Sequence, residues 1–152
     1  MILMKNTIIL LLLLLSSAST RSFGQGSLPS DKIIGTWQSE TKDHKIEIYK
    51  QGNQFCGKLI WYDTMYEADG ITVKKDSNNT DKNLRNRSVK DLVVLTGLTY
   101  QDGEWKDGKI YDVKGGKTWS CIIKLGENDR LKIKGYIGLP AFGKTMSYNR
   151  VK

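Results

Sequence analysis

The chain has 152 residues, with 24 Lys and Arg against 16 Asp and Glu, a formal net charge of +8 and a single histidine. This length supports one domain with a core of its own, without metal or disulfide staples. The basic residues are spread along the chain, a distribution typical of a soluble basic surface rather than a nucleic-acid interface. We therefore expect no nucleic-acid partner.

The first 24 residues have the pattern of a secretory signal peptide. Lys5 precedes an apolar run over 8–15, and small and polar residues follow as far as Gly24. The run is too short to span a membrane comfortably, because a spanning helix needs about 20 predominantly apolar residues. We expect cleavage after Gly24, or alternatively after Ser19, and no transmembrane segment afterwards. The mature chain, 25–152, is then a single domain that is periplasmic or secreted.

Apolar and polar residues alternate with a period of two through most of the mature chain, and no long helical pattern competes with them. The alternation predicts strands at 34–41, 44–51, 54–62, 92–100, 104–112, 117–125, 130–137 and 144–151. Turn sequences such as Gly52-Asn53 separate most of them and are typical of hairpins. We predict an all-β fold, an eight-stranded up-and-down antiparallel barrel, with a two-sheet sandwich as the alternative. Only 29–34 is expected to form a helical turn.

One connection, 63–91, is long, polar and rich in Asp, Asn and Lys. Long connections in compact domains are usually functional or disordered, and this one could lie over the barrel mouth. Its densest polar stretch contains Arg85, Asn86 and Arg87, which could hold a carboxylate or phosphate because guanidinium groups bind such anions in bidentate fashion. We favour a structural alternative, in which Leu84 enters the apolar interior and the arginines tie the loop to the barrel rim. The acidic partners considered for that tie are Asp63, Asp81 and Asp112.

Two features at the ends of the predicted domain resemble the lipocalin pattern. Gly35-Thr-Trp37 lies on the first strand and Arg150 near the end of the last. In lipocalin-type barrels a Gly-x-Trp on the first strand packs beneath an Arg from the end of the barrel. The resemblance implies that Arg150 stacks on Trp37 and closes the barrel floor.

A more specific resemblance covers nearly the whole mature chain. Its motifs occur in the order Gly35-Thr-Trp37, Gly57-Lys-Leu-Ile-Trp61, Asn83-Leu-Arg-Asn-Arg87, Gly108-Lys-Ile-Tyr-Asp112, Gly116-Lys-Thr-Trp119 and Lys134-Gly-Tyr-Ile-Gly138. Together they resemble the uncharacterised bacterial family catalogued as domain of unknown function 2147. The resemblance implies a small exported protein with a lipocalin-like barrel, and it implies no established reaction or ligand.

The strand alternation also predicts which side chains fill the barrel. Trp37, Phe55, Trp61, Trp119 and Tyr148 are among the large residues expected to point inward. An eight-stranded barrel is only just wide enough to be filled by side chains or to hold one small ligand. We therefore expect a filled floor with a shallow cup above it.

The two cysteines have opposite predicted orientations. Cys121 is expected to point inward as a core residue, and Cys56 to point outward as a partly exposed thiol. Their strands are not neighbours in an up-and-down barrel, whereas a disulfide needs Cα atoms within about 7 Å. We expect no disulfide between them.

Other candidates for chemistry are sparse. Tyr111 and Asp112 could present a phenol and a carboxylate at the mouth, although turn capping by Asp112 is the interpretation we favour. His44, beside Asp43, is interpreted as a surface residue, and no histidine or cysteine nearby in sequence suggests a metal site. We predict no catalytic residue, metal or cofactor.

The leading hypothesis is an exported, non-enzymatic barrel whose rim binds a small amphipathic or anionic molecule, or an envelope component. The ligand-binding candidates are Asp63, Arg85, Asn86, Arg87, Tyr111 and Asp112. One alternative is a protein-interaction or envelope-structure module without a small ligand, which predicts a barrel packed to its rim. Another is an enzyme that uses converging rim carboxylates, Asp63 and Asp112.

Overall fold

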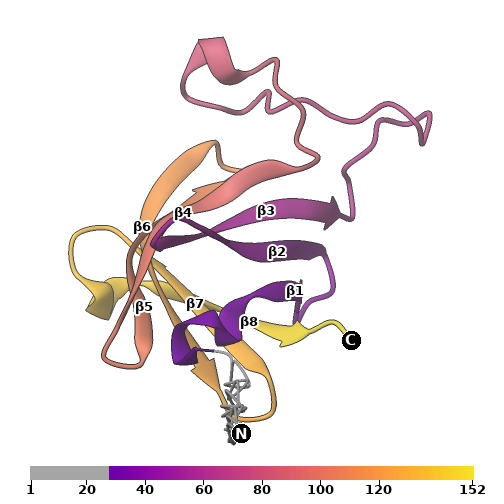
Figure 1. Cartoon of the computed structure of the whole chain (residues 1–152). Helices are drawn as coiled ribbons and strands as arrows, with labels where there is room; N and C mark the ends of the chain where they lie inside the picture. Colours follow the sequence, from indigo (N-terminus) through magenta and orange to yellow (C-terminus); the bar gives the residue numbers. More distant parts are fainter. Residues whose placement is uncertain (1–27) are drawn as a thin grey trace, which may run out of the picture.

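The computed structural model describes residues 28–152, so the predicted signal peptide lies outside the described residues. Eight antiparallel strands pair in sequential order and close into a barrel (Figure 1). They are β1 (Gly35–Ser39), β2 (His44–Gln51), β3 (Gln54–Tyr62), β4 (Leu92–Gln101), β5 (Glu104–Asp112), β6 (Lys117–Gly126), β7 (Arg130–Tyr136) and β8 (Lys144–Arg150). Short 3-10 turns are η1 (Pro29–Ile33), η2 (Lys82–Leu84) and η3 (Pro140–Phe142). The predicted up-and-down barrel is confirmed, and the alternative, a two-sheet sandwich, is wrong because the sheet closes on itself.

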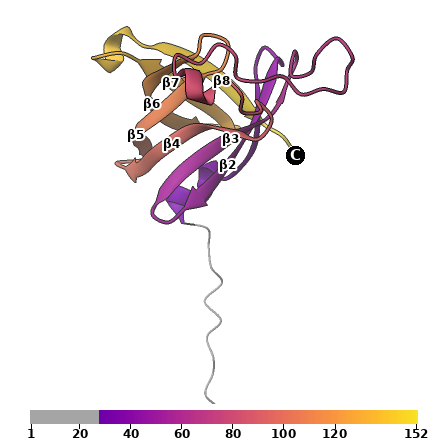
Figure 2. The same cartoon turned by 90° about the horizontal axis from the view of Figure 1, so that it is seen from above.

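The two ends of the barrel differ because consecutive strands run in opposite directions. The connections that follow β1, β3, β5 and β7 lie at one end, which we call the open end. The long loop 63–91 and η3 belong to this end, away from η1 (Figure 2). The other end, the closed end, holds the three tight hairpin turns and η1. This arrangement places the long loop beside the mouth of the barrel.

The closed end is built around Trp37 and Arg150. The guanidinium carbon of Arg150 lies 4.1 Å from the centroid of the buried Trp37 ring. Arg150 also donates to the carbonyl oxygens of Lys32 and Ile34, and the Trp37 indole N–H donates to the carbonyl of Ile33 at 2.8 Å. These bonds join η1 to the barrel, so one stacked pair closes the floor and anchors the first turn.

Gly35 is required at this floor for two reasons. Its φ of +131° is a conformation that side-chain-bearing residues rarely adopt. In addition, a Cβ at this position would lie 2.9 Å from Nη1 of Arg150. The glycine therefore allows the close approach of the arginine.

The core follows the predicted alternation except where strands bulge or end. Trp37, Phe55 and Tyr148 are buried, as predicted. Trp61 is instead exposed, because Lys45 and Ile46 of β2 pair with Trp61 and Leu59 of β3, so that Ile60 is an extra residue that shifts the alternation of β3. The ammonium group of Lys45 lies over the Trp61 ring, 5.7 Å from its centroid.

The cysteines are both free thiols in the structure. Cys121 lies in the core, where burial raises the pKa of its thiol to about 12. The expected exposure of Cys56 is wrong, since only 6% of this residue is exposed. Its Sγ lies 3.5 Å from Oε1 of Gln51, the last residue of β2.

Candidate functional site

A cavity of about 780 Å³ opens at the mouth of the barrel. This volume lies within the range of about 300–1,000 Å³ that is typical of small-molecule sites. Its wall is mostly apolar and includes Ile46, Leu59, Val94, Leu95, Ile110, Val113, Trp119 and Met146. The expected shallow cup is therefore wrong: the closed end is filled, but the open half of the barrel is hollow.

The extra space has a local cause. Trp61, which was expected to occupy the interior, faces solvent because of the β-bulge. Gly135 on β7 lies in the cavity wall and contributes no side chain. A Cβ there would lie 3.5 Å from Cγ2 of Ile110, an ordinary contact distance, so the position is open toward the cavity.

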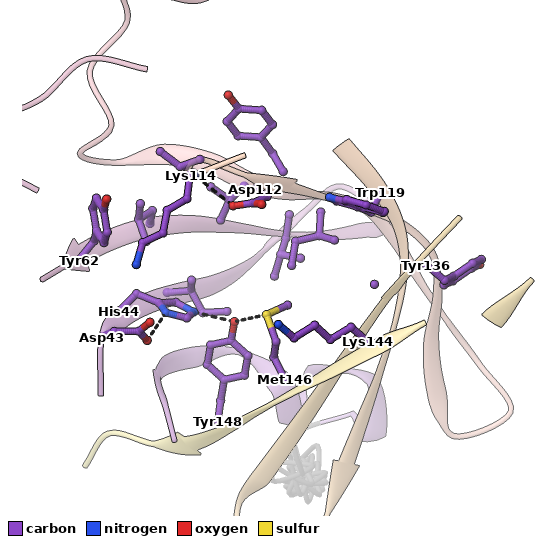
Figure 3. Close-up of a pocket in the computed structure, with 18 of the residues that line it drawn as sticks. Asp43, His44, Tyr62, Asp112, Lys114, Trp119, Tyr136, Lys144, Met146 and Tyr148 are labelled. Carbon is purple, nitrogen blue, oxygen red and sulfur yellow. Dashed lines mark hydrogen bonds and ion pairs between the residues drawn. The ribbon is translucent and has the colours of Figure 1, made fainter. Parts of the chain in front are cut away.

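The most ordered polar feature of the cavity is a chain of three side chains, Asp43, His44 and Tyr148 (Figure 3). Nδ1 of His44 lies 2.7 Å from Oδ1 of Asp43, and Nε2 lies 2.8 Å from the hydroxyl of Tyr148. Because an ionised carboxylate only accepts hydrogen bonds, Nδ1 carries a proton in this network. In the neutral imidazole the Tyr148 hydroxyl then donates to Nε2.

Hydrogen bonds hold the acidic end of this chain in its ionised form. Burial raises the pKa of Asp43, but hydrogen bonds from Ser39, Thr41 and His44 outweigh it and hold the pKa well below its ordinary value. The hydroxyls of Ser39 and Thr41 donate to Oδ1 at 2.7 and 2.8 Å. At the other end, burial and the nearby Asp43 charge raise the pKa of Tyr148. The chain thus presents a carboxylate and a protonated phenol.

The sequence pattern around His44 predicted a surface residue and gave no sign of the hydrogen-bonded Asp43–His44–Tyr148 arrangement. His44 and Tyr148 are 104 residues apart, and only closure of β8 against β1 brings them together. The predicted barrel order, in which the last strand pairs with the first, could have indicated that Tyr148 lies near His44. In the closed sheet Ser39 pairs with Tyr148, and Ser39 also bonds the backbone N–H of His44.

Two lysines face the cavity from opposite sides of the mouth. Lys114 follows β5 and Lys144 begins β8, and both side chains extend toward the open space (Figure 3). Nζ of Lys114 lies 5.1 Å from the centroid of the Tyr62 ring. Within residues 28–152 neither lysine forms an ion pair with a carboxylate. Both cations remain available to an anionic group at the mouth.

The predicted candidates Tyr111 and Asp112 also line this cavity. Oδ1 of Asp112 accepts a hydrogen bond from the backbone N–H of Lys114 at 3.0 Å, which is the turn-capping role. Asp63 is exposed and lies outside the cavity lining. The two rim carboxylates therefore do not converge on the cavity.

Arg87 is held by a carboxylate in the long loop, and not by the partners considered from sequence. Its Nε and Nη2 each lie 2.8 Å from Oδ2 of Asp76, whose side chain is completely buried. The hydroxyl of Tyr111 donates to Oδ1 of Asp76, and the amide of Asn79 donates to Oδ2. We call Asp76, Asn79, Arg87 and Tyr111 the loop clamp.

The remaining candidates of the loop lie outside the cavity. Nε of Arg85 donates to the carbonyl of Asn79 at 2.7 Å, and Asn86 is exposed. Leu84 does not enter the barrel as expected; it is partly exposed in a groove that also contains Val93. The residues of the densest polar segment thus fasten the loop rather than line the interior.

In the described part of the chain, no group of three or more His, Cys, Asp or Glu side chains is arranged to hold a metal ion. The same residues contain no helix that is both long and apolar enough to cross a membrane.

Comparison with known proteins agrees with this architecture. The family model described as an uncharacterized protein conserved in bacteria, DUF2147, matches residues 35–150. The chain belongs to the DUF2147 family. The match begins at Gly35 and ends at Arg150, the two residues that meet at the closed end.

A solved structure has a fold similar to that of this DUF2147 protein. Protein HP1028 from the human pathogen Helicobacter pylori, described as belonging to the lipocalin family, is 28% identical, with a TM-score of 0.67. The similarity covers 78% of this chain and 82% of that chain. No curated protein matches the chain. The DUF2147 barrel is therefore lipocalin-like, while its role has to be inferred from the cavity.

Proposed function

We propose that this DUF2147 protein binds a small amphipathic molecule with an anionic head group in the open cavity. The observation that supports the proposal is a mostly apolar cavity of about 780 Å³ with Lys114 and Lys144 at its mouth, neither of which pairs with a carboxylate among residues 28–152. The binding site is thus the barrel interior, and Arg85 and Arg87 support it from outside by fastening the loop.

The chemistry of the wall favours an apolar ligand body. Burial of each methylene group in such a wall stabilises a complex by about 0.8 kcal/mol. A carboxylate or phosphate head would be matched by Lys114 and Lys144, since charge-assisted hydrogen bonds are the stronger ones. The Tyr148 hydroxyl and the His44 ring add polar groups to the same cavity lining.

Two observations favour binding over catalysis. The raised pKa of Tyr148 keeps its phenol protonated, which does not suit a base or nucleophile. Asp63 and Asp112, the carboxylates considered for an enzyme, do not converge. The interaction-module alternative predicted a barrel packed to its rim, and the cavity does not support that prediction.

Binding of dodecanoate and dodecanol, measured by calorimetry on the purified domain, tests the proposal. We expect dodecanoate to bind and Gly135→Leu to abolish binding, because the new side chain would occupy the cavity. Lys114→Ala/Lys144→Ala should weaken dodecanoate binding about tenfold or more and leave dodecanol unchanged. Lys132→Ala/Lys152→Ala removes the same charge outside the cavity and is the matched control. Equal binding by the wild type and a folded Gly135→Leu variant would exclude the interior as the site.

We further propose that the protein is exported, as the N-terminal pattern indicates. Mass spectrometry of protein recovered from the envelope or the medium should give a mature N-terminus at Gln25, or at Thr20 for the alternative cleavage site. An intact Met1 on protein confined to the cytoplasm would contradict export.

A further inference from the structure

The connection between β7 and β8 exposes a cluster of large apolar side chains beside the cavity mouth. Ile137, Leu139 and Phe142 are 70%, 64% and 84% exposed. Ile137 and Phe142 also belong to the cavity lining. The apolar surface therefore continues from the inside of the barrel to the outer tip of this connection, which we call the tip loop (137–143).

The tip loop has a defined shape. The backbone N–H groups of Phe142 and Gly143 donate to the carbonyls of Leu139 and Pro140, closing η3. A Cβ on Gly143 would lie 2.7 Å from the carbonyl oxygen of Gly135, so the loop folds closely onto β7. Its apolar side chains are thus held outward by the backbone.

The charged residues next to the tip loop in sequence are basic, whereas the carboxylates of Asp43 and Asp112 lie elsewhere in the cavity lining. Between Asp129 and the end of the chain there is no Asp or Glu. Lys134 and Lys144 flank the loop on β7 and β8. Exposed apolar residues between cations are the combination that binds an anionic lipid surface, because the apolar groups enter the interface and the cations meet the head groups.

We propose that the tip loop docks the barrel onto an anionic phospholipid surface, with Leu139 and Phe142 inserted and the cavity mouth facing the lipid. The proposal deepens the proposed function, on which it rests for the ligand: an amphipathic molecule could pass between the bilayer and the cavity along a continuous apolar surface. A soluble ligand would not require such a path.

The long loop offers an internal comparison at the same end of the barrel. Ile71, at the tip of a hairpin bridged by Tyr66 and Val73, is 81% exposed. Its neighbours include Glu67 and Asp69, which an anionic surface repels. Ile71 is at least as exposed as Leu139 but has acidic neighbours, so it is the control for Leu139.

Co-sedimentation with vesicles tests the docking. The wild type should bind phosphatidylglycerol-containing vesicles, bind pure phosphatidylcholine vesicles weakly, and lose binding as salt is raised. Leu139→Ser should lower the partition constant about tenfold, and Ile71→Ser should leave it unchanged. Leu139 lies outside the cavity lining, so dodecanoate binding in vesicle-free buffer should be retained in Leu139→Ser.

Other outcomes would overturn the docking and are distinguishable from failure of the proposed function. Wild-type sedimentation unaffected by Leu139→Ser would exclude the tip loop as the contact. A wild-type dimer in solution that Leu139→Ser converts to a monomer, without vesicle binding, would show that the loop contacts a second copy. Vesicle binding without dodecanoate binding would keep the docking and reject the proposed ligand.

Discussion

The hydroxyl of Tyr111 donates a 2.6 Å hydrogen bond to Oδ1 of Asp76, and this bond joins β5 to the middle of the long loop 63–91. Asp76 has no exposed surface, and the guanidinium of Arg87 and the amide of Asn79 supply its other partners. A buried charge without partners is costly. The satisfied network therefore holds the loop at the open end and shapes one side of the mouth.

Replacement of this carboxylate should release the loop. We expect Asp76→Asn to lower the free energy of unfolding by about 2–3 kcal/mol, because Arg87 and Tyr111 lose their charged acceptor. Urea unfolding measures the loss, and limited proteolysis should cut within 63–91 faster than in the wild type. Glu67→Gln, at an exposed position of the same loop, serves as control. Unchanged cleavage in Asp76→Asn would mean that the clamp does not hold the loop.

The stability of the closed end should depend on the planar shape of the Arg150 guanidinium as well as on its charge. We expect Arg150→Lys to destabilise the fold by about 2 kcal/mol, since an ammonium group cannot stack on Trp37 and reach both carbonyls of η1. Arg130→Lys is the control, because Arg130 is an exposed residue paired with Glu40. Equal melting temperatures for the two variants would contradict the role of the floor.

A substitution at Gly35 tests how far the backbone conformation contributes to the stability of the same floor. Gly35→Ala should destabilise the fold by about 1–3 kcal/mol, because alanine strains the positive φ and crowds the Arg150 guanidinium. Combining it with Arg150→Ala should cost less than the sum of the two single losses, since the crowding disappears with the arginine. Additive losses in a double-mutant cycle would show that only the backbone conformation matters.

The stability of the barrel should depend on Asp43 in acid. Its pKa is lower in the folded protein than the ordinary value of 3.8. The ionised group therefore stabilises the fold above the unfolded pKa, and this contribution is lost as the pH falls from about 5 toward the folded pKa. Urea unfolding at a series of pH values should show a smaller acid loss for Asp43→Asn than for the wild type. Parallel pH curves for the two proteins would contradict this linkage.

The cysteines should be present as thiols that react slowly. Burial raises the pKa of Cys121 to about 12, so little thiolate forms in the folded protein at about pH 8. We expect slow labelling of the native protein by a maleimide or disulfide reagent, and rapid labelling of two thiols per chain in denaturant. No labelling of the denatured, unreduced protein would reveal a disulfide.

The sequence by itself determined the barrel, because its evidence is local. Period-two alternation and hairpin turns specify neighbouring strands, and sequential hairpins leave few ways to arrange eight of them. The family motif likewise pointed to the two residues of the floor, Trp37 and Arg150. These inferences needed only the order of residues and the direction of each strand.

The tertiary structure decided what the barrel contains and how its mouth is built. A single register shift between β2 and β3 turned Trp61 outward and left room for the cavity, which strict alternation could not foresee. Closure of β8 on β1 brought Tyr148 to His44, and a loop without regular structure buried Asp76 under Tyr111. Each depends on contacts between residues distant in sequence, and local pattern carries no information about which distant side chains will meet.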